Sequence, residues 1–457
     1  MKTQKLTVLE KIGFGSGDMA INVVISSMFL IINYFYTDVF GLKPAHLALM
    51  FPLVRIIDAV TDPAMGILTD KLKGRHGRYR PYLLYLAVPF GIAVFLTFTT
   101  PDFAYAGKLV WAYATYIFVT LMFTGVTIPY ISLISVLTDD PKERLSANGY
   151  RLFLAKVAAF LVAIAVPKLA QIWGAESMQR GYQLAMGLMA LLSVFFLLFC
   201  FITTRERVEH VVDRKPLAEQ WKILFRNDQW VVLCIVCVVG TVGYTIRNSV
   251  AAYYAQYYLG DKGLIAPFLG TGVGAAILAM VASTWITKRY CKVQMFRWTQ
   301  LAVGVISLAM LLLVGPGDVV TAFVFYALLS FVVDLHAPVF WSAIAEAVDY
   351  GQAKTGQRVS GIAFGGISFC QKTGMAVAGS LANILLTVFH YVPDVPQSSY
   401  TLTGIALMVT IIPGAFHAIM GWVMFKYRIT DAFYNRMKEG REPGLQPMAG
   451  VIHDTTI

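Results

Sequence analysis

The segment YQLAMGLMALLSVFFLLFCFITT, residues 182–204, contains no Asp, Glu, Lys or Arg. An apolar run of 18 or more residues is long enough to cross, as a helix, a hydrocarbon core about 30 Å thick. Similar runs recur along almost the whole chain of 457 residues, of which 57% are hydrophobic and only 14% are charged. Because a soluble domain carries roughly a quarter charged residues, we predict an all-α integral membrane protein.

Twelve segments share this apolar character, and each is predicted to be a membrane-spanning helix. They lie near residues 17–39, 45–71, 81–100, 109–137, 149–172, 182–204, 230–259, 264–288, 297–315, 319–349, 358–390 and 401–427. No small-residue cleavage site follows the first apolar run, which extends from Met19 to Phe35. We therefore expect a retained helix rather than a signal peptide.

Basic residues fall in alternate loops between these segments. GRHGRYR, residues 74–80, is one such loop, whereas the intervening loops carry little beyond Lys43, Lys108, Arg180 and Lys262. Loops rich in Lys and Arg stay on the cytoplasmic side, so the even number of segments predicts two cytoplasmic termini in a bacterial-type inner membrane. The net charge of +11 then reflects topology, and we expect no nucleic acid partner.

The longest and most polar connection, Arg205 to Asn227, divides the chain into two halves of six segments. The second and eighth segments each end in a basic loop, which indicates a duplication. Duplicated six-helix halves are the architecture of major-facilitator transporters, whose solute site lies between the halves. The predicted parts are an N-terminal bundle at 1–204, a cytoplasmic linker at 205–229, a C-terminal bundle at 230–429 and a cytoplasmic tail at 430–457.

The second segment contains the charged stretch LVRIIDAVTDPAMG, residues 53–66. Arg55, Asp58 and Asp62 are spaced i, i+3 and i+7, which places them on one helical face. Two carboxylates one turn apart in a low dielectric cannot both stay ionised without a cation, a proton or a basic neighbour. Since one Arg cannot neutralise two carboxylates, we predict a cation site. The alternative is a structural ion pair of Arg55 with one Asp while the other is protonated.

We single out five further ionisable residues in the predicted spans. An ionisable side chain in a span costs several kcal/mol unless it faces a cavity or a partner, so each one is a functional candidate. Arginine suits bidentate bonding to sugar hydroxyls or to a carboxylate. The alternatives are packing counter-ions, an acid at a helix N-terminus for the first of the five, and plain packing for the histidine. The candidates for substrate binding are Asp18, Arg151, Arg247, His336 and Lys372.

Aromatic residues flank these charges, and we add Trp341 to the substrate candidates because sugar rings stack on aromatic faces. Cys234 and Cys237 form a CxxC pair inside a span, where packing is the favoured interpretation. The chain has no Walker loop, HExxH, GxSxG or metal-ligand cluster. We therefore expect a protein that is not an enzyme and that needs no cofactor.

Seven short stretches together are similar to one known family, in order and spacing. They resemble the glycoside-pentoside-hexuronide:cation symporters, a family typified by the melibiose permease, and the resemblance covers essentially the whole chain. It implies the major-facilitator fold and symport of a glycoside with Na⁺ or H⁺. The stretches are GFGSGD (13–18), YFYTDVFG (34–41), RIIDAVTDPAMG (55–66), GRYRP (77–81), TIPY (127–130), VDYG (348–351) and TGQR (355–358).

The resemblance also implies a cation site. Asp58 and Asp62 match the cation-binding acids of the family, and Thr124 matches a hydroxyl ligand in its fourth span. Hard oxygen ligands of this kind suit Na⁺.

For the sugar, Asp18, Arg151 and Lys372 match positions that the family uses, with Lys372 between the sugar and cation sites. The chain departs from the melibiose transporters at two sugar contacts. Thr127 stands where they have an Asp, and Ile131 stands where they have a Trp. A galactoside is therefore not the expected substrate.

The loss of this acid makes the predicted pocket more basic, because Arg151, Arg247, His336 and Lys372 remain. A hexuronide or other anionic glycoside is the favoured substrate class, and a pentoside or hexoside stays open.

The predicted mechanism is ordered symport by alternating access. A cation neutralises Asp58 and Asp62, and the relieved charge lets Lys372 and Asp18 turn toward the sugar. Coupling between the two adjacent sites is then reciprocal. We expect a monomer whose partners are a small-molecule glycoside and membrane lipid. The alternative is a transporter of lysolipids or other amphiphiles with the same fold, which predicts a lipid-open and mostly apolar cleft.

Overall fold

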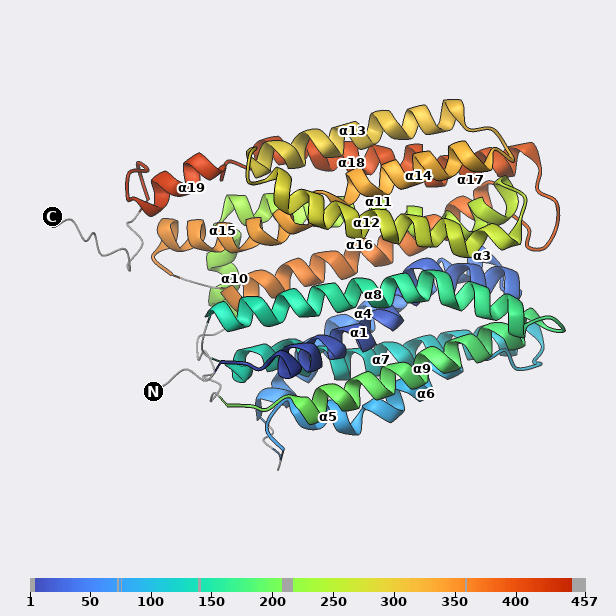
Figure 1. The fold of residues 1–457 in the computed structure, drawn as a ribbon, viewed down its shortest axis with the longest axis horizontal. Coiled ribbons are helices and arrows are strands. Elements are labelled where there is room, and N and C mark those ends of the chain that lie inside the picture. Colours follow the sequence, from blue (N-terminus) through green and yellow to red (C-terminus); the bar gives the residue numbers. More distant parts are fainter. Residues whose placement is uncertain are drawn as a thin grey trace. The chain divides into compact units, whose positions relative to one another are not determined.

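The computed structural model describes residues 5–71, 74, 76–138, 141–207, 217–357 and 360–445, and the named elements within these ranges are all helices (Figure 1). The chain groups into two compact units. The first unit comprises the described residues within Met1–Val212, together with Asn248–Val273 and Gly379–Ile405. The second comprises those within Asp213–Arg247, Gly274–Ala378 and Ala406–Ile457. Several helices of the C-terminal half therefore begin in one unit and end in the other.

The first unit is built on the helices of the N-terminal half. Helix α1 packs against α8 and α9, α6 packs against α9, and α4 packs against α7. The elements are α1 (Val8–Leu30), α2 (Ile32–Tyr34), the π-helix η1 (Phe35–Val39), α3 (Pro44–Leu47), α4 (Met50–Lys71), α5 (Arg80–Tyr85), α6 (Ala87–Thr97), α7 (Tyr105–Leu137), α8 (Pro141–Trp173) and α9 (Met178–Thr203).

The second unit is built on helices of the C-terminal half, among which α13 packs against α14 and α18. The remaining elements of the chain are α10 (Leu217–Phe225), α11 (Asp228–Tyr253), the π-helix η2 (Tyr254–Tyr258), the 3₁₀ turn η3 (Lys262–Leu264), α12 (Ile265–Ile286), α13 (Lys292–Leu313), α14 (Val319–Asp334), α15 (Ala337–Thr355), α16 (Ser360–Val388), α17 (Ser399–Val409), α18 (Ile411–Val423), the 3₁₀ turn η4 (Met424–Lys426) and α19 (Asp431–Lys438).

The prediction of an all-helical membrane protein is confirmed. Each of the predicted apolar segments is mainly helical, and within the described ranges 10 helices are long and apolar enough to cross a membrane. Two segments fall outside that set. The third is divided into α5 and α6, and α6 alone has 11 residues. The eleventh, α16, has 29 residues but is rich in glycine and polar residues.

Helix α1 begins earlier than the predicted start at residue 17. Thr7 caps it, because its hydroxyl accepts from the Glu10 amide while the Glu10 carboxylate accepts from the Thr7 amide at 2.9 Å. This reciprocal pair is a capping box, which satisfies donors that a helix start leaves open. The helix therefore extends through the glycine-rich stretch GFGSGD.

Those glycines bring neighbouring helices close to α1. A Cβ atom at Gly13 would lie 1.8 Å from the Thr203 hydroxyl oxygen, and one at Gly17 would lie 2.4 Å from the Tyr130 ring. The Tyr130 hydroxyl donates to the Phe14 carbonyl at 2.7 Å. The small residues thus allow α7 and α9 to approach the backbone of α1.

The tenth predicted span, 319–349, is not one continuous helix. It is broken between Asp334 at the end of α14 and Ala337 at the start of α15. Pro338 supplies no amide hydrogen and its ring crowds the preceding turn, so a helix cannot run through this position undisturbed. Thr410 marks a similar break between α17 and α18, three residues before Pro413.

Candidate functional site

The predicted cation ligands lie on α4 and α7, two helices that pack together in the first unit. The Thr124 hydroxyl on α7 donates to the Asp62 carboxylate on α4 at 2.8 Å. Thr124 and Asp58 are buried, with exposed fractions of 3% and 4%, and Asp62 is partly buried. Because Asp58 and Asp62 are four residues apart on one helix, they face the same side. The fold thus brings two carboxylates and one hydroxyl to one place between two helices.

Arg55 lies on α4 one turn before Asp58. Its side chain lies outside the described residues, so the alternative of a structural ion pair with an aspartate stays open.

Asp18 and Arg151 form an ion pair between α1 and α8, with 3.3 Å between a carboxylate oxygen and Nε. Both side chains are largely buried, at 13% and 25% exposure. The alternative that Asp18 is an acid at a helix N-terminus is wrong, because α1 begins at Val8. Gly15 contributes to the close packing, since a Cβ there would lie 3.0 Å from the Tyr150 carbonyl oxygen.

Thr127 lies on α7, nearly one turn after Thr124. Its buried hydroxyl has no hydrogen-bond partner among the residues that the structure describes. The position where relatives of the melibiose type carry an acid is therefore occupied here by a small polar group that can both donate and accept.

Arg247 is the most deeply buried of the predicted substrate residues in the second unit, with an exposed fraction of 2%. Its guanidinium carbon lies 5.9 Å from the ring centroids of both Tyr244 and Tyr326. A guanidinium at this distance from two aromatic rings is within the range of cation–π attraction. The Nε hydrogen has no acceptor within the described part of the chain.

His336 lies in the break between α14 and α15. Its Nδ1 makes a short hydrogen bond to the Val333 carbonyl and lies 3.3 Å from the Gln300 amide nitrogen. The His336 ring meets the edge of Phe296, with 4.9 Å between the centroids. The break that Pro338 imposes therefore fixes the orientation of this imidazole.

Trp341 lies one turn farther along α15 and is 44% exposed. Lys372 lies on α16 and is partly buried. Arg247, His336, Trp341 and Lys372 all belong to the second unit, whereas the predicted cation ligands, Asp18, Thr127 and Arg151 belong to the first.

A buried carboxylate cluster in the first unit has no functional assignment in the sequence prediction. Asp38, at the end of the first predicted span, accepts hydrogen bonds from Tyr257, from Tyr391 at 2.5 Å and from Thr37 at 2.6 Å. The Thr37 hydroxyl also contacts the Tyr253 hydroxyl at 2.7 Å. We call Thr37, Asp38, Tyr253, Tyr257 and Tyr391 the Asp38 cluster. The only sequence signal was an acid in an apolar span, inside the motif YFYTDVFG.

A second polar cluster, in the second unit, is also new. Gln300 on α13 and His417 on α18 are fully buried, and the Gln300 Oε1 lies 3.0 Å from the His417 Nδ1. Both are polar residues in apolar spans, which is itself a reason to suspect a role. The sequence prediction weighed the charged residues and His336 and passed over these two.

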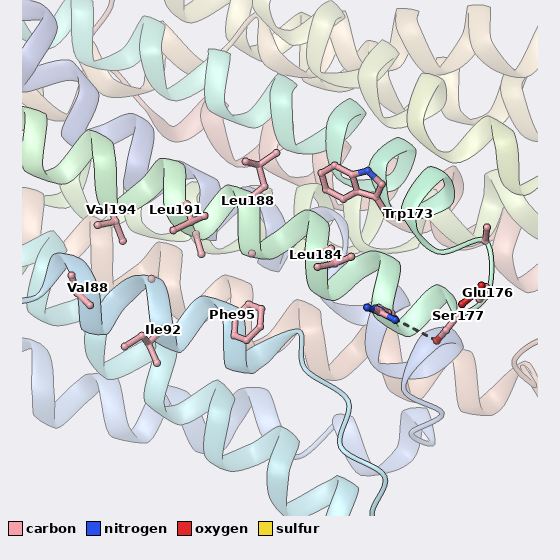
Figure 2. Close-up of a pocket in the computed structure, with 15 residues that line it drawn as sticks. Val88, Ile92, Phe95, Trp173, Glu176, Ser177, Leu184, Leu188, Leu191 and Val194 are labelled. Carbon is pink, nitrogen blue, oxygen red and sulfur yellow. Dashed lines mark hydrogen bonds between the residues drawn. The ribbon is translucent and has the colours of Figure 1, made fainter.

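An apolar groove runs along α6 and α9 in the first unit (Figure 2). Val88, Ile92, Phe95 and Leu191 line its length, and Trp173 and the polar residues Glu176 and Ser177 lie toward one end. Arg180 also lines the groove. Neither the predicted cation ligands nor the predicted substrate residues line it.

Comparison with known proteins adds independent information. Residues 13–431 match the model of the MFS/sugar transport protein family. The chain is 33% identical over 428 residues to the inner membrane symporter YicJ of Escherichia coli, covering 93% of each chain. It is 35% identical over 432 residues to the putative glycoside/cation symporter YagG of the same organism, covering 94% of this chain and 93% of that one.

Among solved structures, a bacterial homologue of the human lysosomal transporter Spinster, in an inward-facing and unoccupied conformation, superposes with a TM-score of 0.65 at 14% identity. The match covers 92% of this chain and 97% of that one. At this identity the likeness shows the fold alone, and it confirms the predicted major-facilitator fold.

The motif resemblance and the expectation of a transporter rather than an enzyme are both confirmed by these matches. The family match spans most of the chain, and the relatives align over nearly their whole length. The chain therefore belongs to the MFS/sugar transport protein family.

Proposed function

We propose that this protein is a secondary active transporter that couples uptake of a glycoside to Na⁺ or H⁺ by alternating access. The observation that carries the proposal is the Thr124 to Asp62 hydrogen bond of 2.8 Å between α4 and α7, beside the buried Asp58. The naming of YagG as a putative glycoside/cation symporter supports the same activity.

The cation site consists of Asp58, Asp62 and Thr124. All three supply oxygen atoms, the ligand type that hard cations prefer. With no cation bound, Thr124 donates its hydroxyl hydrogen to Asp62, and the two neighbouring carboxylates repel one another. A bound Na⁺ or H⁺ relieves that repulsion. The hydroxyl of Thr124 also ties α7 to α4, so cation binding acts on two helices at once.

The proposed substrate-binding residues are the Asp18–Arg151 pair and Thr127 of the first unit, and Arg247, His336, Trp341 and Lys372 of the second. The set contains three cations, Arg151, Arg247 and Lys372, and one acid, Asp18, so its formal charge is positive. An anionic glycoside, such as a hexuronide, complements this charge better than a neutral one. Trp341, with 44% of its surface exposed, provides a face on which a sugar ring stacks.

In this proposal two six-helix halves, at 1–204 and 230–429, are joined by the linker at 205–229, and the tail at 430–457 lies in the cytoplasm with the N-terminus. The protein works as a monomer in an inner membrane. Binding of cation and glycoside is reciprocal, because each ligand raises the affinity for the other by the same factor. A membrane potential adds roughly 2.3 kcal/mol per charge per 100 mV to accumulation.

The test is uptake by the purified protein in proteoliposomes, with glucuronides, galactosides, xylosides and a lysophospholipid. Each substrate is offered with a Na⁺ gradient, a proton gradient or neither. We expect one glycoside class to accumulate only with one of the gradients. Accumulation of the lysophospholipid alone would instead support the amphiphile alternative.

The variant Asp62→Asn tests whether Asp62 is the residue that couples cation binding to glycoside transport. We expect it to lose accumulation while it still exchanges internal for external glycoside, since exchange needs no net cation flux. Asp102→Asn, an exposed acid between α6 and α7, is the matched control and should behave as wild type. Normal cation-driven accumulation by Asp62→Asn would sink the assignment.

A further inference from the structure

We propose that Gln300 and His417 are positioning residues, which hold His336 and Arg247 in the orientation that substrate binding requires. The proposal rests on the proposed function and extends it to two side chains on α13 and α18. Neither Gln300 nor His417 is assigned to the substrate site itself. Both are buried, at 0% and 1% exposure.

The Val333 carbonyl sets the orientation of the cluster. It lies in the last turn of α14, where helix carbonyls lack amide partners. It accepts from the Gln300 amide nitrogen at 3.2 Å and from the Nδ1 of His336. Because a carbonyl can only accept, the Gln300 NH₂ group must point to Val333 and the His336 proton must be on Nδ1. A neutral His336 therefore has its acceptor at Nε2.

The same logic fixes the tautomer of His417. With its NH₂ group directed to Val333, Gln300 presents its oxygen to the His417 Nδ1 at 3.0 Å. An amide oxygen can only accept, so His417 carries its proton on Nδ1 and an acceptor lone pair on Nε2. The Val333 carbonyl thus fixes the tautomer of His336, and Gln300, which shares that carbonyl, fixes the tautomer of His417.

The Nε2 side of the His417 ring, which carries the acceptor lone pair, lies against α11, the helix that carries Arg247. A Cβ atom at Gly243, one turn before Arg247 on α11, would lie 3.3 Å from the His417 Cδ2 and 2.9 Å from the Phe416 Cβ. Cδ2 is bonded to Nε2, so the absence of a side chain at Gly243 lets this edge reach α11. The tautomer set by Gln300 presents an acceptor to the Arg247 side of α11, whereas the opposite tautomer would present a second donor beside a cation.

Two readouts separate positioning from a merely structural role. If Gln300 positions His336 and Arg247, its loss raises the glycoside KM measured at saturating cation. The maximal rate and the half-saturating cation concentration measured at saturating glycoside stay unchanged, because the cation ligands belong to the other unit. General damage to the fold would alter all three quantities and lower the thermal midpoint together.

The experiment measures uptake kinetics of wild type and variants in proteoliposomes. We expect Gln300→Leu to raise the glycoside KM about tenfold, the equivalent of one lost hydrogen bond. Ser307→Ala is the matched control, because Ser307 is buried on the same helix and packs beside Gly414 of α18. It should keep the wild-type KM.

A second pair of variants keeps the test decisive if Gln300→Leu does not fold. His417→Phe keeps the ring volume but removes both nitrogens, and we expect a raised KM. His417→Asn places an amide donor where Nδ1 stood and should recover a KM within about threefold of wild type. Wild-type KM values in both Gln300→Leu and His417→Phe, or a half-saturating cation concentration at saturating glycoside that shifts together with KM, would overturn the positioning role alone. Absence of cation-driven glycoside uptake by the wild type would overturn the proposed function and this inference together.

Discussion

The first unit contains two buried carboxylate sites, around Asp38 and around Asp58 and Asp62, and the two differ in the groups that surround the carboxylates. Asp38 is surrounded by hydroxyl donors, from Tyr257, Tyr391 and Thr37. Asp62 accepts from Thr124 but lies one turn from a second acid, Asp58. Hydroxyl donors offset the loss of water around one carboxylate. They cannot remove the repulsion between two.

The difference separates a carboxylate with a structural role from one that needs a ligand. The residues that bond Asp38 are uncharged, and two of them, Tyr257 and Tyr391, are distant in the chain, so the cluster ties η1 to the η2 helix and to the segment after α16. In the proposed mechanism, the Asp58–Asp62 pair is the carboxylate site that takes up the cation or proton. Four substitutions test this distinction.

The largest effect is expected for Asp58→Asn. Removing one charge of the pair abolishes the need for a cation, so cation-driven accumulation should fall by about a hundredfold. A hundredfold change corresponds to about 2.8 kcal/mol, which is in the range of a charge-assisted hydrogen bond. The thermal midpoint in cation-free buffer should hold or rise, because repulsion is relieved. Uptake and thermal unfolding check the two halves of this prediction. A lower midpoint together with intact accumulation would contradict it.

Asp38→Asn should have the opposite pattern. The amide replaces one acceptor oxygen by a donor that faces tyrosine hydroxyls, so we expect the protein to lose about 2 kcal/mol of stability. Cation dependence of uptake should not change. Thermal unfolding of this variant is compared with that of Asp102→Asn, an exposed acid of the same unit. An altered cation requirement in Asp38→Asn would assign Asp38 to the coupling site.

Thr124→Val keeps the shape of the side chain but removes the hydroxyl that donates to Asp62. We expect the half-saturating cation concentration to rise about tenfold, with a nearly unchanged maximal rate, because one ligand oxygen is lost. Thr124→Ser retains the oxygen and should stay close to wild type. The measurement is uptake against cation concentration, and equal values for the Val and Ser variants would remove Thr124 from the cation site.

Tyr391→Phe should have the smallest effect, about 1 kcal/mol of stability. Asp38 keeps its bonds from Tyr257 and Thr37, and the Phe ring preserves the edge contact with Tyr253, whose centroid lies 5.2 Å away. The double variant Asp38→Asn with Tyr391→Phe is informative. Its loss of stability should be smaller than the sum of the losses of the two single variants, because both remove the same hydrogen bond. Full additivity in thermal unfolding would show that the hydroxyl does not act through Asp38.

Much of the fold was predictable from the chain. The apolar segments identified the membrane-spanning helices, and the motifs identified the family. Asp58 and Asp62 were predictable as a pair because the distance between them is set within one helix. The break at His336 was missed, although Pro338 was a visible signal. The ion pair of Asp18 with Arg151 was not foreseen as a pair, since its members lie on different helices.

What the sequence determined by itself is the solvent of this protein, the helical segments and the residues that share one helical face, because these properties depend on composition and on a fixed period of 3.6 residues per turn. Only the tertiary structure revealed which faces meet. Asp38 is separated from Tyr391 by 353 residues, and Gln300 from His417 by 117. Inside a membrane both the lipid-facing and the packed sides of a helix are apolar, so hydropathy does not encode helix rotation. The polar contacts between helices, and with them the Asp38 and Gln300 clusters, were decided by the packing.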